Sequence, residues 1–419
     1  SHGSEGDPDI QNGWLYRDYL IRALNQDLPY DQLVREHIAG DLLDAPRINH
    51  ELGINESAIG PAHWRMVFHG FAPTDALEEK VRFIDDQINV FSKAFLGLTV
   101  SCARCHDHKF DAISQKDYYA LFATLASCRP GRVAIDAPEV LEKNRESLES
   151  LKPQIRDSLA REWKASLARL PKRLTSGGDL LQLKTEPQHV LDHWNRLSAH
   201  VAEGKLFAQA WAQAFSQAPS QATTPTSNPA HRHWRFNEPD NEPQNEPTNW
   251  FRSGNGLAST PSRAGAFAVA PEGPSALTGI YPSGIYSHLT SSKHAARLSS
   301  DRVDLPGEFE VWIRAIGEGG ATSRFVVHDY PRNGTVFPVT PLKPSWQWYR
   351  FDLTYWDGDN IHLELTSGAD APLLASGDAR SWFGIREAKI VAKGGPAPKE
   401  FPEAVTPWLA ITDQTPPYT

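Results

Sequence analysis

The sequence predicts an α+β multidomain protein, in which helical domains come first and an all-β sandwich of jelly-roll type follows. Up to about residue 217, apolar residues recur at the i, i+3, i+4 and i+7 spacing of helices that bury one face. Between residues 232 and 395 they alternate with polar residues instead, as in half-buried strands. These patterns predict a helical domain over 1–135, a helical hairpin over 136–217, a linker over 218–231, the sandwich over 232–395 and a Pro-rich tail over 396–419.

Length and composition set the outer limits of this prediction. The chain has 419 residues, which is enough for two or three domains. Its formal net charge of −9 argues against a nucleic acid or an anionic membrane as partner. No stretch approaches about 18 consecutive apolar residues, so we expect no membrane span.

Local signals place the first helices. Residues 14–40 read as two helices that are separated at Asn25–Pro29, with Gly40 as the C-cap of the second. Residues 41–60 read as a loop. A third helix is expected over 75–95, with Thr74 or Asp75 as its N-cap, and Ser114 is expected to cap a fourth.

The hairpin and its linker follow from composition and spacing. A long charged helix is expected over 138–172, with an interruption near Pro153, and a second one over 188–216. Residues 216–229 are rich in Ser, Thr, Pro, Gln and Ala, which is typical of an extended linker. Residues 237–247 repeat Asn-Glu-Pro three times and are expected to form a stiff acidic loop.

Strand signals follow without intervening helices. Alternation is clear over 309–315, 323–327, 346–353, 361–365 and 385–391, and turn residues separate these runs, as in a jelly roll. Trp346 and Trp348 share one face of a strand. They form either a platform on which sugars stack or an inner row of the core, and core packing is the commoner use of such residues.

The motif Cys102-Ala103-Arg104-Cys105-His106 has the spacing of a c-type haem attachment site. Two thiols three positions apart can each bond one vinyl group of the same haem, and His106 then becomes the proximal axial ligand of the iron. The alternatives are a structural zinc site, a redox disulfide and two buried thiols. Zinc needs a further ligand near these residues, and the sequence has no second Cys-x-x-Cys. The motif therefore favours a cytochrome c-like domain over residues 1–135.

The other side of the iron requires either a second ligand or an open position. Met66 and His69 are the candidate ligands, because they lie three positions apart and would share a helix face. Two protein ligands would indicate electron transfer, and an open position would indicate ligand binding or catalysis.

Charged and polar neighbours of the motif have candidate roles as well. Arg104 and Lys109 are candidates to pair with the haem propionates. His108 is too close to His106 in sequence to reach the opposite side of the same iron, and it could instead meet a propionate, a partner or a neighbouring cofactor.

Oxygen ligands in the β-rich half could hold calcium. The candidates are Asp352, Asp357, Asp359 and Glu364, although the Asp-Gly-Asp-Asn run that contains two of them suits a turn equally well. No serine elbow, phosphate-binding loop or His-Glu-x-x-His motif is present, so the residues alone nominate no catalytic group.

The ends and the cysteine count bear on the location of the protein. The chain begins Ser1-His2-Gly3 and its only Met is Met66, so we expect it to be a processed or excised piece of a longer polypeptide. Covalent haem c is attached outside the cytoplasm, which predicts an exported, periplasmic or extracellular protein. Haem would occupy two of the three cysteines and leave Cys128 alone.

Several runs together resemble the planctomycete cytochrome-associated proteins. The most specific is the run from Leu96 to Tyr119, with Cys-Ala-Arg-Cys-His-Asp-His-Lys at its centre, and it departs from the family only at Ala112, where Pro is usual. Tyr16-Arg-Asp-Tyr, Pro29-Tyr-Asp and Ala39-Gly-Asp-Leu-Leu resemble the same domain. The runs that begin at Tyr281, Tyr330, Asp352 and Ser381 are similar to the β domain often inserted after it.

The resemblance implies exported proteins whose link to polysaccharide breakdown rests on the domains that accompany them. It also implies that about a hundred upstream residues and a further C-terminal domain are missing here. The expected function is electron transfer by haem c, as part of a larger oxidoreductase, with a redox partner protein and polysaccharide as expected partners. The alternatives are a non-enzymatic carbohydrate- or protein-binding module with a structural haem, and a zinc-bound structural site.

Overall fold

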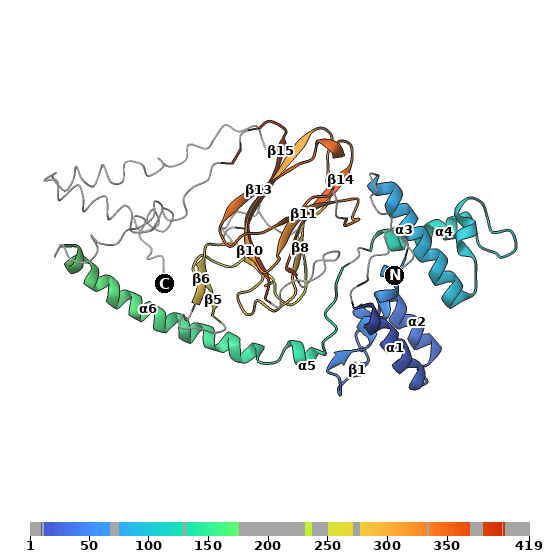
Figure 1. The fold of residues 1–419 in the computed structure, drawn as a ribbon, viewed down its shortest axis with the longest axis horizontal. Helices are drawn as coiled ribbons and strands as arrows, with labels where there is room; N and C mark the ends of the chain where they lie inside the picture. Colours follow the sequence, from blue (N-terminus) through green and yellow to red (C-terminus); the bar gives the residue numbers. More distant parts are fainter. Residues whose placement is uncertain are drawn as a thin grey trace. The chain divides into compact units, whose positions relative to one another are not determined.

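Helices dominate the first part of the chain and strands the second (Figure 1), as the two hydrophobic periodicities predict. The computed structural model describes residues 10, 12–67, 75–128, 131–175, 231–236, 250–270, 277–332, 335–368, 380–395 and 397–398. Residues 1–143 and 231–393 form one unit, and residues 144–230 and 394–419 form another. Each unit is described by itself.

The predicted helix pair is confirmed as α1 (Gly13–Asn25) and α2 (Tyr30–Ala39). Gly40 follows α2, but not for the expected reason, because its φ of −63° is right-handed rather than left-handed. A Cβ at Gly40 would lie 1.9 Å from the carbonyl oxygen of Ser57, and one at Gly60 would lie 2.3 Å from that of Glu36. The two glycines therefore allow the backbones of α2 and the following 3₁₀ segment to pack closely.

Residues 41–60, expected as a loop, contain short regular elements. These are η1 (Gly40–Leu42), the antiparallel pair β1 (Ile48–Asn49) and β2 (Ile54–Asn55), and the 3₁₀ segment η2 (Ser57–Arg65). The expectation of a loop was wrong because buried polar contacts replace hydrophobic periodicity here. Glu36 and Glu56 are both fully buried, and Arg47 and Arg22 respectively pair with them.

The helices around the cysteine motif begin as predicted. The side chain of Asp75 accepts a hydrogen bond from the backbone N–H of Glu78 and so caps α3 (Ala76–Phe91), which continues into the π-helical turn η3 (Ser92–Leu96). Gly97 ends this turn with a left-handed φ of 66°. The motif lies on the 3₁₀ segment η4 (Val100–Arg104), and Ser114 caps α4 (Gln115–Ala126).

The long helix expected over 138–172 is two helices, the short α5 (Pro138–Leu141) and the 31-residue α6 (Arg145–Thr175). Pro153 does not interrupt α6, because the helix passes through it. Four of the expected segments lie outside the described residues. They are the helix over 188–216, the linker except for residue 231, the Asn-Glu-Pro repeats and the tail except for residues 397–398.

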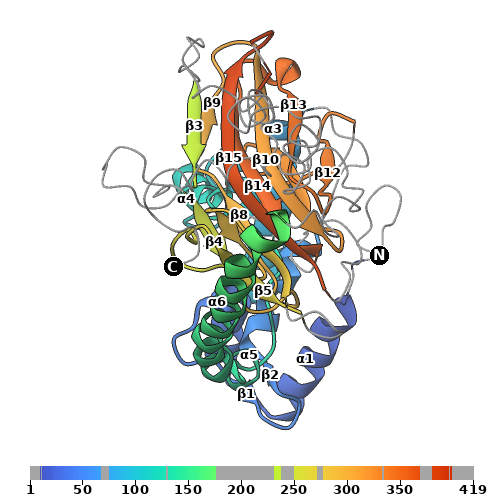
Figure 2. The same ribbon diagram turned by 90° about the vertical axis from the view of Figure 1, so that its left-hand side faces the viewer.

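The strands form two facing antiparallel sheets, which confirms the predicted sandwich (Figure 2). In the described residues the first sheet has the order β13 (Gln347–Asp352), β10 (Phe309–Glu318), β15 (Trp382–Ala392) and β3 (Arg232–Arg235), and β7 (Ile285–Tyr286) also pairs with β15. The second has the order β12 (Val339–Pro341), β11 (Thr322–Val327), β14 (Asn360–Thr366), β8 (Arg297–Ser299) and β4 (Phe251–Ser253), and β9 (Val303–Asp304) also pairs with β14. A separate hairpin joins β5 (Ala266–Val269) and β6 (Leu277–Tyr281).

The main core lies between these sheets. Val311 and Ile313 of β10 and Phe325 of β11 are at most 2% exposed, and they belong to one apolar cluster that also contains Ala76 of α3. Trp348 does not join this row, because it lies on the other face of β13, half-buried, beside the Nζ of Lys389 at 4.9 Å from its ring centre. Trp346 packs against a smaller cluster around Tyr286. The preference for core packing was therefore wrong for Trp348, whereas Trp346 does pack against a core cluster, although a smaller one.

Candidate functional site

The two motif cysteines lie on and directly after η4. Val100 and Ala103, at 7% and 0% exposed, anchor η4 in the apolar cluster between α3 and α4. Cys102, between these two residues, and Cys105, after them, are both exposed and free. The local fold thus presents two reduced sulfur atoms to solvent from a buried backbone, which rules out the alternative of two buried thiols.

His106 is exposed next to these thiols. Its Nδ1 lies 2.7 Å from the carbonyl oxygen of Asp107, so Nδ1 carries the proton and donates to that oxygen. In the neutral ring, this contact selects the tautomer whose Nε2 has a lone pair. A carbonyl partner on the distal ring nitrogen is what orients a metal-binding histidine in proteins.

The neighbouring cations have different surroundings. Arg104 is engaged, because its Nη1 lies 3.0 Å from the Oδ2 of Asp85 on α3. Lys109 is exposed, and its Nζ lies 5.2 Å from the ring centre of Phe110, which is 83% exposed. Of the two propionate candidates, Lys109 is the more accessible.

His108 has a structural role that the sequence did not reveal. Its side chain is 5% exposed, its Nε2 lies 2.9 Å from the Oγ1 of Thr99, and its Nδ1 accepts the backbone N–H of Asp111 at 2.9 Å. Both ring nitrogens are therefore used to close the loop after the motif. A histidine flanked by polar residues gives no sequence signal for this role.

Of the two candidates for the second axial position, only Met66 lies among the described residues. Met66 is half-buried at the end of η2, where its backbone N–H donates to the carbonyl of His63 at 2.9 Å. His69 lies outside the described residues. His63, three residues before Met66, is buried among aromatic rings, and this burial lowers its pKa to about 4.

The donor set fits a c-type haem. Two free, exposed thiols at the required spacing adjoin an imidazole whose Nε2 has a lone pair, and the exposed Phe110 offers an apolar surface nearby. Within the described part of the chain, no three His, Cys, Asp or Glu side chains gather closely enough to hold a metal ion. The zinc set of Cys102, Cys105 and His106 is therefore not assembled as such.

Among the described residues the calcium candidates do not gather into a metal site, and three of them, Asp352, Asp359 and Glu364, have other partners. The fully buried carboxylate of Glu364 accepts hydrogen bonds from Arg324, with the nearest Nη2–Oε1 distance 2.5 Å. Oδ1 of Asp352 accepts the hydroxyl and backbone N–H of Thr354, and Asp359 pairs with a histidine. The carboxylates are not gathered around one point.

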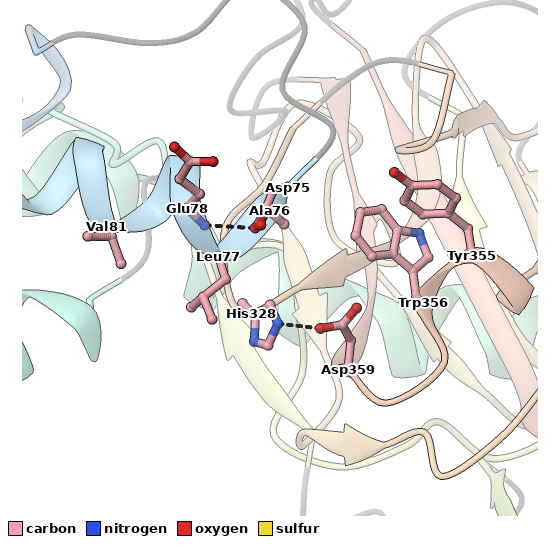
Figure 3. Close-up of a pocket in the computed structure, with 9 residues that line it drawn as sticks. All are labelled: Asp75, Ala76, Leu77, Glu78, Val81, His328, Tyr355, Trp356 and Asp359. Carbon is pink, nitrogen blue, oxygen red and sulfur yellow. Dashed lines mark hydrogen bonds and ion pairs between the residues drawn. The ribbon is translucent and has the colours of Figure 1, made fainter.

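A cavity of about 650 Å³ lies where the start of α3 meets the sandwich (Figure 3). Leu77 of α3 points toward His328, and Nε2 of His328 donates to Oδ1 of Asp359 at 2.7 Å. Tyr355 and Trp356 line the other side. The remaining lining residues are Asp75, Ala76, Glu78 and Val81.

The wall of this cavity is held in an unusual conformation. His328 and Asp329 both have left-handed φ values, 50° and 56°, which are costly for residues other than glycine. Nζ of Lys80 on α3 donates to the carbonyl of His328 at 2.7 Å, and Asp329 accepts hydrogen bonds from Arg302 and His362. A dense set of ion pairs thus fixes the strained turn.

The sequence nominated Asp359 as a candidate calcium ligand, but it did not predict the cavity. The start of α3 and the turn at His328 are some 250 residues apart in the chain. No periodicity or motif connects them. The available signals were two family-like runs, one that begins at Tyr330, two residues after His328, and one that begins at Asp352 and contains Tyr355 and Trp356.

The fold and the site thus define a helical domain that carries an exposed Cys-x-x-Cys-His segment and packs on an antiparallel β-sandwich. Residues 1–130 match the family PSCyt2, described as a protein of unknown function (DUF1549). This match covers under half of the chain and fits the resemblance to the planctomycete cytochrome-associated proteins. No curated protein matches the chain.

Several solved structures are similar to part of the chain. A family 61 carbohydrate-binding module in complex with β-1,4-galactotriose is 19% identical and covers 34% of this chain and 88% of its own, with a TM-score of 0.22. The K1 cleaved adhesin domain of Lys-gingipain from Porphyromonas gingivalis W83 is 13% identical over 39% and 98%, with a TM-score of 0.24. A family 29 carbohydrate-binding module is 9% identical over 38% and 89%, with a TM-score of 0.23. At these scores the likenesses carry no functional argument.

No helix of the described residues is long and apolar enough to cross a membrane.

Proposed function

We propose that the helical domain carries a covalent c-type haem and transfers electrons. The observation that carries this proposal is the pair of exposed, free thiols of Cys102 and Cys105 beside an imidazole with fixed tautomer. Haem bound there would supply one-electron exchange with a partner protein. Cys102 and Cys105 would hold the macrocycle, and Nε2 of His106 would ligate the iron.

The surrounding residues have supporting roles in this proposal. The ion pair of Arg104 with Asp85 holds the backbone between the two cysteines in place, and Lys109 is the accessible cation for a propionate. Met66 and His69 remain the proposed candidates for the second axial position. Attachment of haem c implies export to the periplasm or beyond.

Covalent haem tests the proposal directly. The chain, expressed with a c-type haem maturation system, should show a haem band after denaturing electrophoresis and a Soret absorption that shifts on reduction. Cys102→Ala and Cys105→Ala should weaken the covalent band, and the double variant should abolish it. Cys128→Ala is the matched control, because Cys128 is also an exposed free cysteine. Lack of covalent haem in the matured wild-type chain would refute the proposal.

A second function is proposed for the β-sandwich, namely binding of polysaccharide. The observation in its favour is the cavity in which Tyr355, 58% exposed, adjoins hydrogen-bonding carboxylates and His328. Aromatic faces and carboxylates are the groups that bind the apolar faces and the hydroxyls of sugars. Together the two functions would make the chain a redox module of a larger oxidoreductase that acts on polysaccharide.

Two measurements on the full chain test the second function. One is retention on insoluble polysaccharides, and the other is binding to an array of soluble glycans. Binding with micromolar affinity and a haem that does not cycle in a redox titration would favour a binding module with structural haem. A haem that cycles reversibly would favour electron transfer. Absence of binding to every glycan would remove the second function and leave the first intact.

A further inference from the structure

The charge of the cavity at the start of α3 narrows the class of ligand it can take. Asp75, Glu78 and Asp359 are among the residues that line it, and among the described residues no Lys or Arg does. Two cations of α3 next to the lining residues are engaged by other groups. Arg82 pairs with Glu78, and Lys80 is directed at the His328 carbonyl and at Asp329.

The partners of these carboxylates leave acceptor oxygens for a ligand. Oδ1 of Asp75 accepts the N–H of Glu78 at 2.8 Å, and Oδ1 of Asp359 accepts from His328. A carboxylate has a second oxygen and about four acceptor positions in all, so each of these groups can accept further hydrogen bonds. Donors such as hydroxyl or ammonium groups complement this wall.

A rigid aromatic surface completes the cavity. Trp356, 4% exposed, is fixed by a hydrogen bond from its Nε1 to the carbonyl of Val336 at 3.2 Å. The ring of Tyr355 packs edge-on against it, with 4.8 Å between ring centres, and is 58% exposed. A supported and exposed ring suits contact with the C–H face of a sugar.

We propose that this cavity binds a sugar unit that carries no acidic group, either neutral or amino-substituted. This inference rests on the proposed polysaccharide binding and assigns it a place and a selectivity. The ring of the sugar packs on Tyr355, and its donors meet Asp75 and Asp359. A uronate or sulfated unit is rejected because its charge would approach these two carboxylates without a lining Lys or Arg.

Calorimetry with the full chain tests the assignment, using a neutral cello-oligosaccharide, a glucosamine oligomer and an oligogalacturonate. At low salt the neutral or amino oligomer should bind at least about tenfold more tightly than the acidic one. Tyr355→Ala should weaken binding about tenfold, a loss that corresponds to about 1.4 kcal/mol. Phe251→Ala is the matched control, since Phe251 is 67% exposed and does not line the cavity.

Asp75→Asn tests the role of charge separately from folding. Asn caps a helix about as well as Asp, so α3 should form normally while one negative charge is lost. The preference over the acidic oligomer should fall several-fold, and its salt dependence should weaken. Equal affinity for acidic and neutral oligomers in the wild-type chain would overturn the inference.

The failures of the two proposals are distinguishable. If Tyr355→Ala and Phe251→Ala both bind glycans as the wild-type chain does, polysaccharide binding stands and the cavity is the wrong site. If the wild-type chain binds no glycan of any class, polysaccharide binding and this inference are both refuted.

Discussion

The guanidinium of Arg104 and the carboxylate of Asp85 form an ion pair at 3.0 Å that ties the residue between the two motif cysteines to the middle of α3. The same carboxylate accepts the hydroxyl of Tyr118 on α4 at 2.7 Å. Burial, together with this acceptor, raises the pKa of Tyr118. One side chain therefore connects three elements around the proposed haem segment, and α3 also continues to the cavity at its N-terminus.

Asp85→Ala should destabilise this part of the protein. It leaves the hydroxyl of Tyr118, a residue that is 1% exposed, without its acceptor, and such a loss costs about 1–3 kcal/mol. Denaturant unfolding should show a lower free energy of unfolding, and amide hydrogen exchange should accelerate over residues 100–106. Asp31→Ala is the control, because its ion pair with Arg35 is exposed and worth less than about 1 kcal/mol. Equal effects of the two substitutions would contradict the structural role of Asp85.

The buried carboxylate of Glu36 should contribute more to stability than the carboxylate of Asp85 does. It accepts hydrogen bonds from Tyr19 at 2.8 Å, from Ser57 at 2.9 Å and from Arg47 at 3.1 Å. Burial alone would raise the pKa of Glu36, but the hydrogen bonds from Arg47, Tyr19 and Gln32 hold it below its ordinary value. Glu36→Ala leaves the partly buried Arg47 without this partner, so we expect a loss of about 3–5 kcal/mol in unfolding free energy.

Calorimetric scans of Glu36→Ala test this expectation, and Glu139→Ala is the control. Glu139 pairs with His50 on the surface, and its side chain is 55% exposed. The midpoint of unfolding should fall by several degrees or more for the first variant and by little for the second. A Glu36→Ala protein as stable as the wild type would show that the buried network does not hold α1, α2 and η2 together.

Hydrophobic periodicity and capping residues predicted the elements whose contacts are local. Asp75 and Ser114 marked the starts of α3 and α4, and alternation of apolar residues marked β10 and β14. The segment after Gly40 escaped prediction, because its order depends on buried Glu36 and Glu56 and on close backbone contacts, which leave no periodic signal.

The candidate site also has a part that the sequence predicted and a part that it did not. The haem motif is contiguous, so its residues could be named from spacing alone, whereas the partners that position it, Asp85 and Thr99, come from unmarked positions. The cavity needed the tertiary fold, since Leu77 and His328 meet only when α3 packs on the sandwich. Trp348 was misplaced because alternation tells which residues share a face but not which face is buried.

Two glycine substitutions should separate the effect of close packing on stability from the effect of backbone conformation. Gly40→Ala places a Cβ 1.9 Å from a backbone oxygen of η2, so α2 and η2 must move apart. Gly97→Ala meets no atom within 4 Å and carries only the cost of a left-handed φ, about 1 kcal/mol. Thermal unfolding should show a clearly larger loss for Gly40→Ala. The reverse order would show that the packing of α2 on η2 tolerates a side chain at Gly40.

Stability should fall as the pH rises above neutrality, because of His362. This side chain is 4% exposed, with Nδ1 3.1 Å from Oδ1 of Asp329 and Nε2 3.7 Å from Oε2 of Glu364. Burial would lower the pKa of His362, but the two carboxylates raise it above its ordinary value. A raised pKa means that the protonated form stabilises the folded state. Its contribution is complete below the unfolded pKa of about 6.5 and is lost as the pH rises through the folded pKa.

A denaturant series from pH 6 to 9 measures this loss on the wild-type chain and on His362→Gln. Loss of one proton changes the free energy of unfolding by at most about 1.4 kcal/mol per pH unit, so the wild-type slope should exceed that of the variant by up to this amount in the window above pH 6.5. Phe251→Ala provides the control, because Phe251 is exposed and does not titrate, and it should keep the wild-type slope. If His362→Gln also kept it, His362 would be neutral in the folded state, and Arg302 and Lys80 alone would neutralise Asp329 at the turn that lines the cavity.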